Sequence, residues 1–166
     1  MKIRLFEVDS FTVKPFKGNP AAVCLLDQPR EDAWMQALAT ELLLSETAFL
    51  YPKGNDYDLR WFTPSTEVNL CGHATLASAH ILFELGLYDP DETIQFHTKS
   101  GVITATFDLG TITLDMPLIR PIPAVSTPLL EEILGQAPLD VAHSEDLAIL
   151  VAELADLDAL KALPDA

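Results

Sequence analysis

Basic residues are scarce in this chain of 166 residues, which has 10 lysines and arginines against 25 aspartates and glutamates. The formal net charge is therefore −15 at pH 7. A field of that sign repels a polyanion. We expect that nucleic acid is not a partner of this protein.

Cysteine is also rare, with Cys24 and Cys71 as the two examples. No charged region followed by an apolar stretch and a small-residue cleavage site opens the chain. The longest apolar runs, residues 21–26 and 74–82, are too short to span a bilayer. These absences predict a soluble protein without a membrane partner, in a reducing cytoplasm.

Sequence motifs for common cofactors are missing as well. The chain has no phosphate-binding glycine loop, no dinucleotide fingerprint and no Gly-x-Ser-x-Gly elbow. Cys71 and His73 are too close together for a structural zinc site and lack a second ligand pair at a recognised spacing. We therefore expect no cofactor and no metal.

The sequence does contain enough apolar residues for one well-packed domain, at 49% of the chain. Residues 121–166 carry nine acids and one base, so the composition changes near Arg120. The repeated prolines of residues 116–123 predict an extended connector at the same place. We therefore expect a first domain over residues 1–120, and a connector with the beginning of a second domain over residues 121–166.

Most of the first domain has the alternation and turn signals of strands. Residues 31–44 have apolar residues at a spacing of four, which predicts an amphipathic helix. Residues 73–85 are apolar around nearly the whole helical circumference, so we expect a buried helix that includes His80 and ends at Gly86. The prediction is an α+β fold, a curved and mainly antiparallel β-roll wrapped around a buried central helix. The predicted strands cover residues 3–8, which we expect to be buried on both faces, and residues 21–26, 47–51, 58–62, 93–98, 102–107 and 111–115.

The remaining residues predict only part of a second roll. Residues 129–134 favour a short helix, residues 147–154 an apolar strand, and residues 156–163 a final helical piece. His143 is expected in a loop. We expect the apolar strand to lack a partner, which would expose its edge.

The entry to the buried helix, residues 69–75, is a candidate functional segment. Gly72 lets a backbone approach a ligand closely, and the unpaired N–H groups of the first helical turn attract a carboxylate. A thiol at Cys71 would have its pKa lowered there and could act as a base or nucleophile. The alternative is that Cys71 is a small buried hydrophobe and His73 caps the helix.

Glu46 is the second candidate, because it lies between the apolar run 42–44 and the strand 47–51. Burial raises the pKa of a carboxyl group and suits it to proton transfer. The alternative is that Glu46 points to water at a helix–strand junction. Asn19 could contact a ligand, although a turn role in the segment 18–20 is the other interpretation.

Four motifs in order resemble the amino-terminal half of the phenazine-biosynthesis protein F (PhzF) family. They are the sequences FKGNPAAV at residues 16–23, LSETAF at residues 44–49, RWFTP with EV at residues 60–68, and LCGHATLA at residues 70–77. The resemblance covers residues 1–120 well and the remainder loosely. It implies a fold similar to that of diaminopimelate epimerase, in which two β-rolls, each around a central helix, enclose the active site.

The resemblance also implies the roles of particular residues. Glu46 matches the glutamate that acts as general acid/base in a cofactor-independent isomerisation within a biosynthetic process. Gly72 and His73 match substrate-contacting positions, and Cys71 stands where the related epimerases have a catalytic cysteine. The expected activity is proton transfer on a small carboxylate-bearing metabolite.

Family members are about twice as long as this chain, and the second roll is incomplete here. The alternative function is therefore a truncated, non-catalytic remnant that binds a partner or itself. We expect a homodimer, or an association with a missing second half.

Overall fold

A computed structural model describes residues 3–145 and 149–164. The chain divides into two compact units, Met1–Pro117 and Leu118–Ala166, and each is described by itself. Among the described residues, no helix combines the length and the apolar character that crossing a membrane requires.

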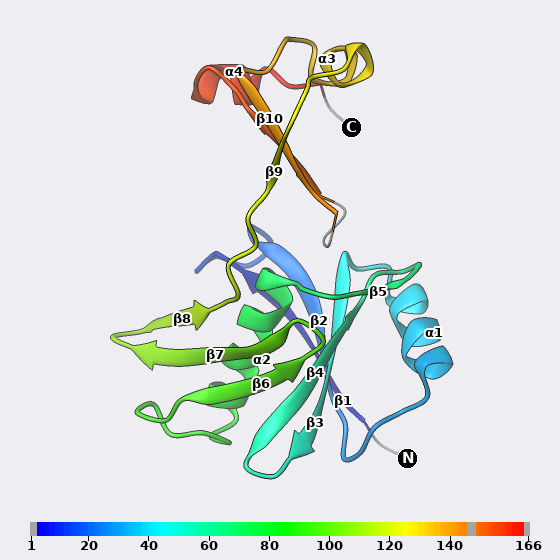
Figure 1. Ribbon diagram of the computed structural model, residues 1–166. Coiled ribbons are helices and arrows are strands. Elements are labelled where there is room, and N and C mark those ends of the chain that lie inside the picture. Colours follow the sequence, from blue (N-terminus) through cyan, green and yellow to red (C-terminus); the bar gives the residue numbers. More distant parts are fainter. Residues whose placement is uncertain (1–2, 146–148, 165–166) are drawn as a thin grey trace. The chain divides into compact units, whose positions relative to one another are not determined.

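The first unit contains one curved sheet with the strand order β1-β2-β3-β4-β6-β7-β8, in which the two-residue strand β5 also pairs with β4 (Figure 1). The pairings are antiparallel except β2 with β3 and β4 with β6. Parallel neighbours need a crossover, and each of these two crossovers carries a helix. The strands are β1 (Arg4–Ser10), β2 (Asn19–Leu25), β3 (Glu46–Lys53), β4 (Asp56–Phe62), β5 (Glu67–Val68), β6 (Ile94–Thr98), β7 (Gly101–Asp108) and β8 (Thr111–Asp115).

The crossover helix α2 (Gly72–Glu84) is the centre of this roll. It contacts β1 and β8, the two edge strands, as well as β2 and β3, so the sheet curls around it (Figure 1). The other crossover helix, α1 (Asp32–Leu42), packs on the opposite face of β3 and β4. The structure therefore confirms a mainly antiparallel β-roll around a central helix.

Small side chains allow α2 to lie close to the sheet. Ala74, Ala77 and Ala79 have no exposed surface. The helix is not buried on all sides, however, because His80 and Glu84 are exposed. The prediction that His80 lies within a fully buried helix is therefore wrong.

The end of α2 agrees with the prediction from the sequence. Gly86 has a φ of 62° and donates its N–H to Phe83 O at 3.0 Å. Leu87 donates to Leu82 O at 3.0 Å. These two bonds form a Schellman motif, in which a glycine takes the left-handed conformation at low cost.

Strand β1 differs from its prediction of burial on both faces. It is an edge strand, and Leu5 is 43% exposed. The apolar pattern of residues 3–8 is typical of a core strand, but strand order decides which strands are covered. Strand β2, which lies between β1 and β3, is buried from Ala21 to Leu25.

The second unit has a three-stranded antiparallel sheet with the order β11-β10-β9. Strand β10 was missed by the sequence analysis, so the prediction that His143 lies in a loop is wrong. The prediction that the apolar strand of residues 147–154 lacks a partner is wrong, because β11 pairs with β10. Leu147, which was part of that prediction, lies outside the described residues. Among the described residues of this unit, Val141 is the one buried apolar side chain. The elements are β9 (Ile122–Ala124), α3 (Pro128–Leu134), β10 (Asp140–Ser144), β11 (Ile149–Glu153) and α4 (Leu157–Lys161).

Candidate active site

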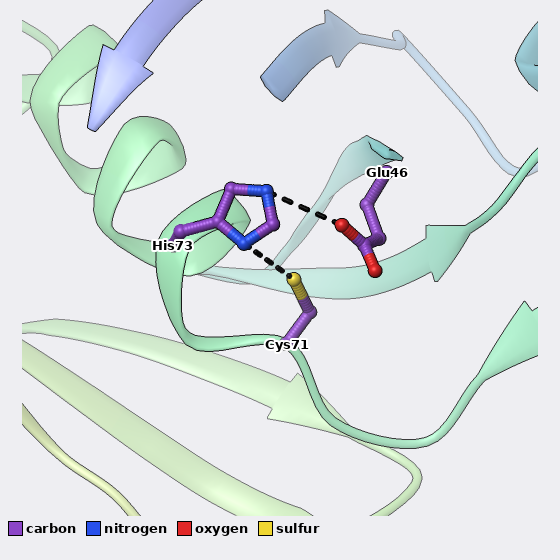
Figure 2. A group of neighbouring side chains, drawn as sticks. All are labelled: Glu46, Cys71 and His73. Carbon is purple, nitrogen blue, oxygen red and sulfur yellow. Dashed lines mark hydrogen bonds and ion pairs between the residues drawn. The ribbon is translucent and has the colours of Figure 1, made fainter. Parts of the chain in front are cut away.

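The first unit brings together three of the predicted site residues, Glu46, Cys71 and His73 (Figure 2). Glu46 Oε2 lies 3.3 Å from His73 Nε2. Cys71 Sγ lies 3.5 Å from His73 Nδ1. The imidazole ring therefore stands between the carboxylate and the thiol, with one ring nitrogen facing each.

The position of Glu46 follows from the alternation of β3. Ala48 and Leu50 point into the core around α2, so Glu46, on the same face of the strand, points toward that helix. Parallel pairing places Glu46 beside Ala21 of β2. Glu46 is thus the first residue of a buried strand, at the end of the sheet where α2 begins.

The site is partly shielded from water. The side chains of Glu46 and His73 are 21% and 11% exposed, and Cys71 is 7% exposed. The alternative that Glu46 simply points to water therefore does not describe this structure. His73 does not cap the helix either, because the N-cap residue is Cys71. The Cys71 side chain makes no capping hydrogen bond.

Two serines, which the sequence analysis did not single out, contact His73. Ser45 Oγ lies 3.3 Å from His73 Nε2, the same nitrogen that faces Glu46. Ser10 Oγ donates to the backbone O of His73 at 2.8 Å and is almost fully buried. Ser45 precedes Glu46 directly in the chain, which is the one sequence signal that could have indicated it.

Of the two interpretations of Cys71, the structure supports the small buried residue and not the thiol of lowered pKa. Burial raises the pKa of Cys71 to about 12, and the nearby Glu46 carboxylate acts in the same direction. Backbone N–H groups of His73 and Ala74 lower this pKa, but by less. Desolvation thus outweighs the positive end of the helix, and the thiol stays protonated near neutral pH. Cys24 is fully buried in β2, and burial raises its pKa to about 11.

Gly72 and Asn19 lie at the same end of the roll. A Cβ atom at Gly72 would meet only Met116, at 3.8 and 4.0 Å, which is ordinary van der Waals contact. Packing within the first unit therefore does not require a glycine there. Asn19 is exposed at the start of β2 and pairs with Ser10 of β1.

The three clustered residues also offer potential metal ligands. One ligand atom from each of Glu46, Cys71 and His73 lies within 4.8 Å of the others. A single ion, however, binds one nitrogen of an imidazole ring, whereas here the two nitrogens face different neighbours. This geometry does not favour coordination of one ion by all three residues.

A separate cavity of about 1010 Å³ opens between β1, the loop after it, α2 and the β7–β8 hairpin. Its lining is mainly apolar and includes Leu76, Phe83 and Phe107. Glu46, Cys71 and His73 do not line it. Ser10, which donates to the backbone O of His73, does line it, so the cavity adjoins the candidate active site without including the three clustered residues.

The family model for phenazine biosynthesis-like proteins, PhzC-PhzF, matches residues 8–162. This chain belongs to that family. The match extends beyond the first unit, so the second unit of this PhzF-family chain is also part of the family fold.

Relatives of this PhzF-family chain carry the name isomerase. An uncharacterized isomerase of Halalkalibacterium halodurans is 56% identical over 121 residues, which are 73% of this chain and 46% of that protein. An uncharacterized isomerase of Pseudomonas aeruginosa is 43% identical over 171 residues, covering 99% of this chain and 66% of that protein.

Solved structures show the same fold. The crystal structure of a PhzF-family protein from Enterococcus faecalis superposes with a TM-score of 0.83 at 38% identity, covering 99% of this chain and 62% of that one. The chain thus spans roughly half to two thirds of the length of these relatives. The comparisons support an isomerase-type family and leave the substrate open.

Proposed function

We propose that this chain supplies the proton-transfer half of a cofactor-independent isomerase or epimerase that acts on a small carboxylate-bearing metabolite. The observation that carries the proposal is the contact between the Glu46 carboxylate and the His73 imidazole, 3.3 Å apart at the start of α2. The two groups are partly buried, which strengthens electrostatic interactions with a substrate.

The proposed reaction needs no electron acceptor. Glu46 removes a proton from a carbon next to an electron-withdrawing group, and the electron pair of the broken C–H bond delocalises into the substrate. Glu46, whose abstracted proton can exchange with water, then returns a proton to a different carbon or to the other face. Atoms and electrons are conserved, and the enzyme ends in its starting protonation state.

His73 would assist by hydrogen bonding to Glu46 and to the substrate. Its Nε2 already lies near Glu46 and Ser45, and its Nδ1 near Cys71. Which nitrogen carries the proton depends on the tautomer. Bound substrate would replace the water that still reaches the partly exposed carboxylate.

The substrate carboxylate would bind at the beginning of α2, where backbone N–H groups and the helix dipole attract an anion. Gly72 supports this, since no packing contact within its unit explains the missing side chain. We propose Gly72, His73 and Asn19 as substrate-binding residues. Exposed Asn19 lies across from Ser10, which binds the backbone of His73.

Isotope exchange tests this function. The chain, alone and with a separately expressed second roll of a family member, is incubated in D2O with small carboxylates that carry an acidic C–H bond. With the second roll present, we expect enzyme-dependent loss of that C–H signal in the NMR spectrum of at least one compound. Exchange that survives removal of both Glu46 and His73 would contradict the proposal.

A thiol-based epimerase is the competing mechanism, and replacement of Cys71 separates the two. We expect Cys71→Ala to keep turnover within roughly ten-fold of the parent, because general acid/base catalysis resides on Glu46. Since the pKa of Cys71 is about 12, a thiolate-dependent rate would continue to rise with pH toward that value. A loss as large as that of Glu46→Gln, together with such a pH profile, would favour the thiol.

The second candidate function is a non-catalytic binding module, and oligomeric state tests it. Ile149, Leu150 and Val151 of β11 are about half exposed, at 49%, 52% and 54%. Exposed apolar strands at a sheet edge drive association. We therefore expect the isolated chain to dimerise or aggregate in sedimentation experiments and to lack isomerase activity. A monodisperse monomer that turns over substrate unaided would contradict both expectations.

A further inference from the structure

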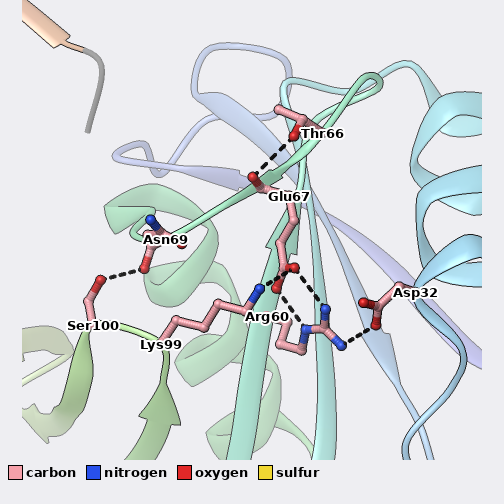
Figure 3. Close-up of polar contacts among 7 residues, drawn as sticks. All are labelled: Asp32, Arg60, Thr66, Glu67, Asn69, Lys99 and Ser100. Carbon is pink, nitrogen blue, oxygen red and sulfur yellow. Dashed lines mark hydrogen bonds and ion pairs between the residues drawn. The ribbon is translucent and has the colours of Figure 1, made fainter. Parts of the chain in front are cut away.

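A cluster of charged side chains holds the segment that leads into α2 (Figure 3). Arg60 of β4 donates two hydrogen bonds to Glu67 of β5, from Nε to Oε1 at 2.7 Å and from Nη2 to Oε2 at 2.8 Å. Its Nη1 donates to Asp32 Oδ1 of α1 at 2.7 Å. Lys99, in the β6–β7 turn, donates to Glu67 Oε2. We call Asp32, Arg60, Glu67 and Lys99 the Arg60 network.

A neighbouring hydrogen bond extends this attachment toward the active site. Ser100 Oγ donates to the backbone O of Asn69 at 2.8 Å (Figure 3). Ser100 follows Lys99 directly, and Asn69 lies two residues before Cys71. The β6–β7 turn thus contacts segment 67–71 at two points, the Glu67 side chain through Lys99 and the Asn69 backbone through Ser100.

Backbone pairing in this segment is short. Strand β5 has two residues, which pair with Trp61 and Phe62 of β4. Val68 and Leu70 pack against the core, and the Arg60 network adds polar side-chain contacts that hold this segment before the chain enters α2.

The central pair of the network is well placed to be rigid. The Arg60 and Glu67 side chains are 18% and 16% exposed. Burial by itself would raise the pKa of Glu67, but hydrogen bonds from Arg60 and Lys99 outweigh burial and lower it, so Glu67 stays ionised. A two-point arginine–carboxylate contact has a defined geometry, which fixes the two side chains relative to each other.

We propose that the Arg60 network positions the active site by fixing segment 67–71 and hence the place of Cys71 and the first turn of α2 relative to Glu46. The inference rests on the proposed function only in taking the Glu46 cluster as the reacting site. Glu67 and Lys99 are positioning residues, because they act on His73 and Cys71 through the segment.

The reactivity of the Cys71 thiol measures its position without any substrate. Iodoacetamide labelling of the full chain, read by mass spectrometry of peptides, follows Cys71 and Cys24 in one sample. We expect Glu67→Gln to speed the labelling of Cys71 by roughly ten-fold, because a loosened segment opens more often. Fully buried Cys24 should keep its rate. Lys99→Met should also speed the labelling of Cys71. Lys99→Arg, which keeps the positive charge, should leave that labelling as slow as in the parent.

Asp58→Asn is the matched control. It removes an ion pair with Lys53, of 2.9 Å, from the same strand as Arg60 without affecting segment 67–71. Its labelling rates at Cys71 and Cys24 should equal those of the parent. The proposal is overturned if Cys71 keeps its parent rate in Glu67→Gln and Lys99→Met, or if Cys24 accelerates in parallel, which would mean general unfolding.

Kinetics in an active assembly complete the test. We expect Glu67→Gln to lower kcat by up to about 10²-fold with little change in KM, because small misplacement of reacting groups slows chemistry strongly. Lys99→Met should lower kcat in the same way, and Lys99→Arg, which keeps the charge, should leave it at the parent value. A displaced thiol with unchanged kcat would overturn the positioning role. Labelling needs no isomerase activity, so a failure of the proposed function would appear only in the isotope-exchange assay.

Discussion

Glu46→Gln is expected to lower turnover by about 10²–10⁴-fold in an active assembly, which is the contribution of a positioned acid/base group. The amide keeps the shape of the carboxylate and can accept a hydrogen bond from His73, but it cannot take up a substrate proton. The fold should persist, because Glu46 is the first residue of β3 and keeps partial contact with water. Deuterium exchange into substrate provides the measurement.

The matched control for this variant is Glu41→Gln, which makes the same chemical change at an exposed position on α1. It should leave turnover and the thermal midpoint at the parent values. Circular dichroism of Glu46→Gln should show a melting curve close to that of the parent. Full activity in Glu46→Gln would remove this residue from the mechanism, whatever the outcome at Cys71.

Ala79→Asp is expected to unfold the first unit. Ala79 has no exposed surface and belongs to the core between α2 and the sheet. A buried charge without a partner costs several kcal/mol, against a total stability of roughly 5–15 kcal/mol for a domain. The variant should lose its cooperative thermal transition or melt far below the parent.

The adjacent residue gives a control on the same helix. His80 is exposed, so His80→Asp introduces the same charge with access to water and should change the melting temperature by only a few degrees. Because both variants place an aspartate on the same helix, the difference between their melting temperatures reflects burial of the charge and not helix propensity. Equal melting temperatures for Ala79→Asp and the parent would contradict the central position of α2.

Local patterns predicted most elements of the first unit. The hairpin β3–β4 turns at Gly54, whose φ is 66°, and the β7–β8 hairpin turns through Leu109 and Gly110, whose φ values are 47° and 83°. Such turns depend on residues adjacent in the chain, so their signals are visible in the sequence. The second unit was predicted less well, because β10 has too few apolar residues to stand out.

The candidate site was predicted in its members but not in its electrostatics. Glu46 and the segment 71–73 were identified from the residues and the family motifs, and the structure brings them within hydrogen-bonding range. The sequence left two interpretations of Cys71 open, and the structure supports the buried, protonated thiol over the acidic one. Ser10 was missed, because its contact with His73 spans 63 positions of the chain.

The sequence by itself determined the strand and helix propensities, the turn positions, the family and the identity of the candidate acid/base group, since each depends on residues close together along the chain. Only the tertiary structure decided that β1 is an exposed edge, that His80 faces outward and that burial keeps Cys71 protonated. It also decided that Arg60 and Lys99 meet at Glu67. These properties depend on strand order and solvent exclusion, which arise when distant segments pack together.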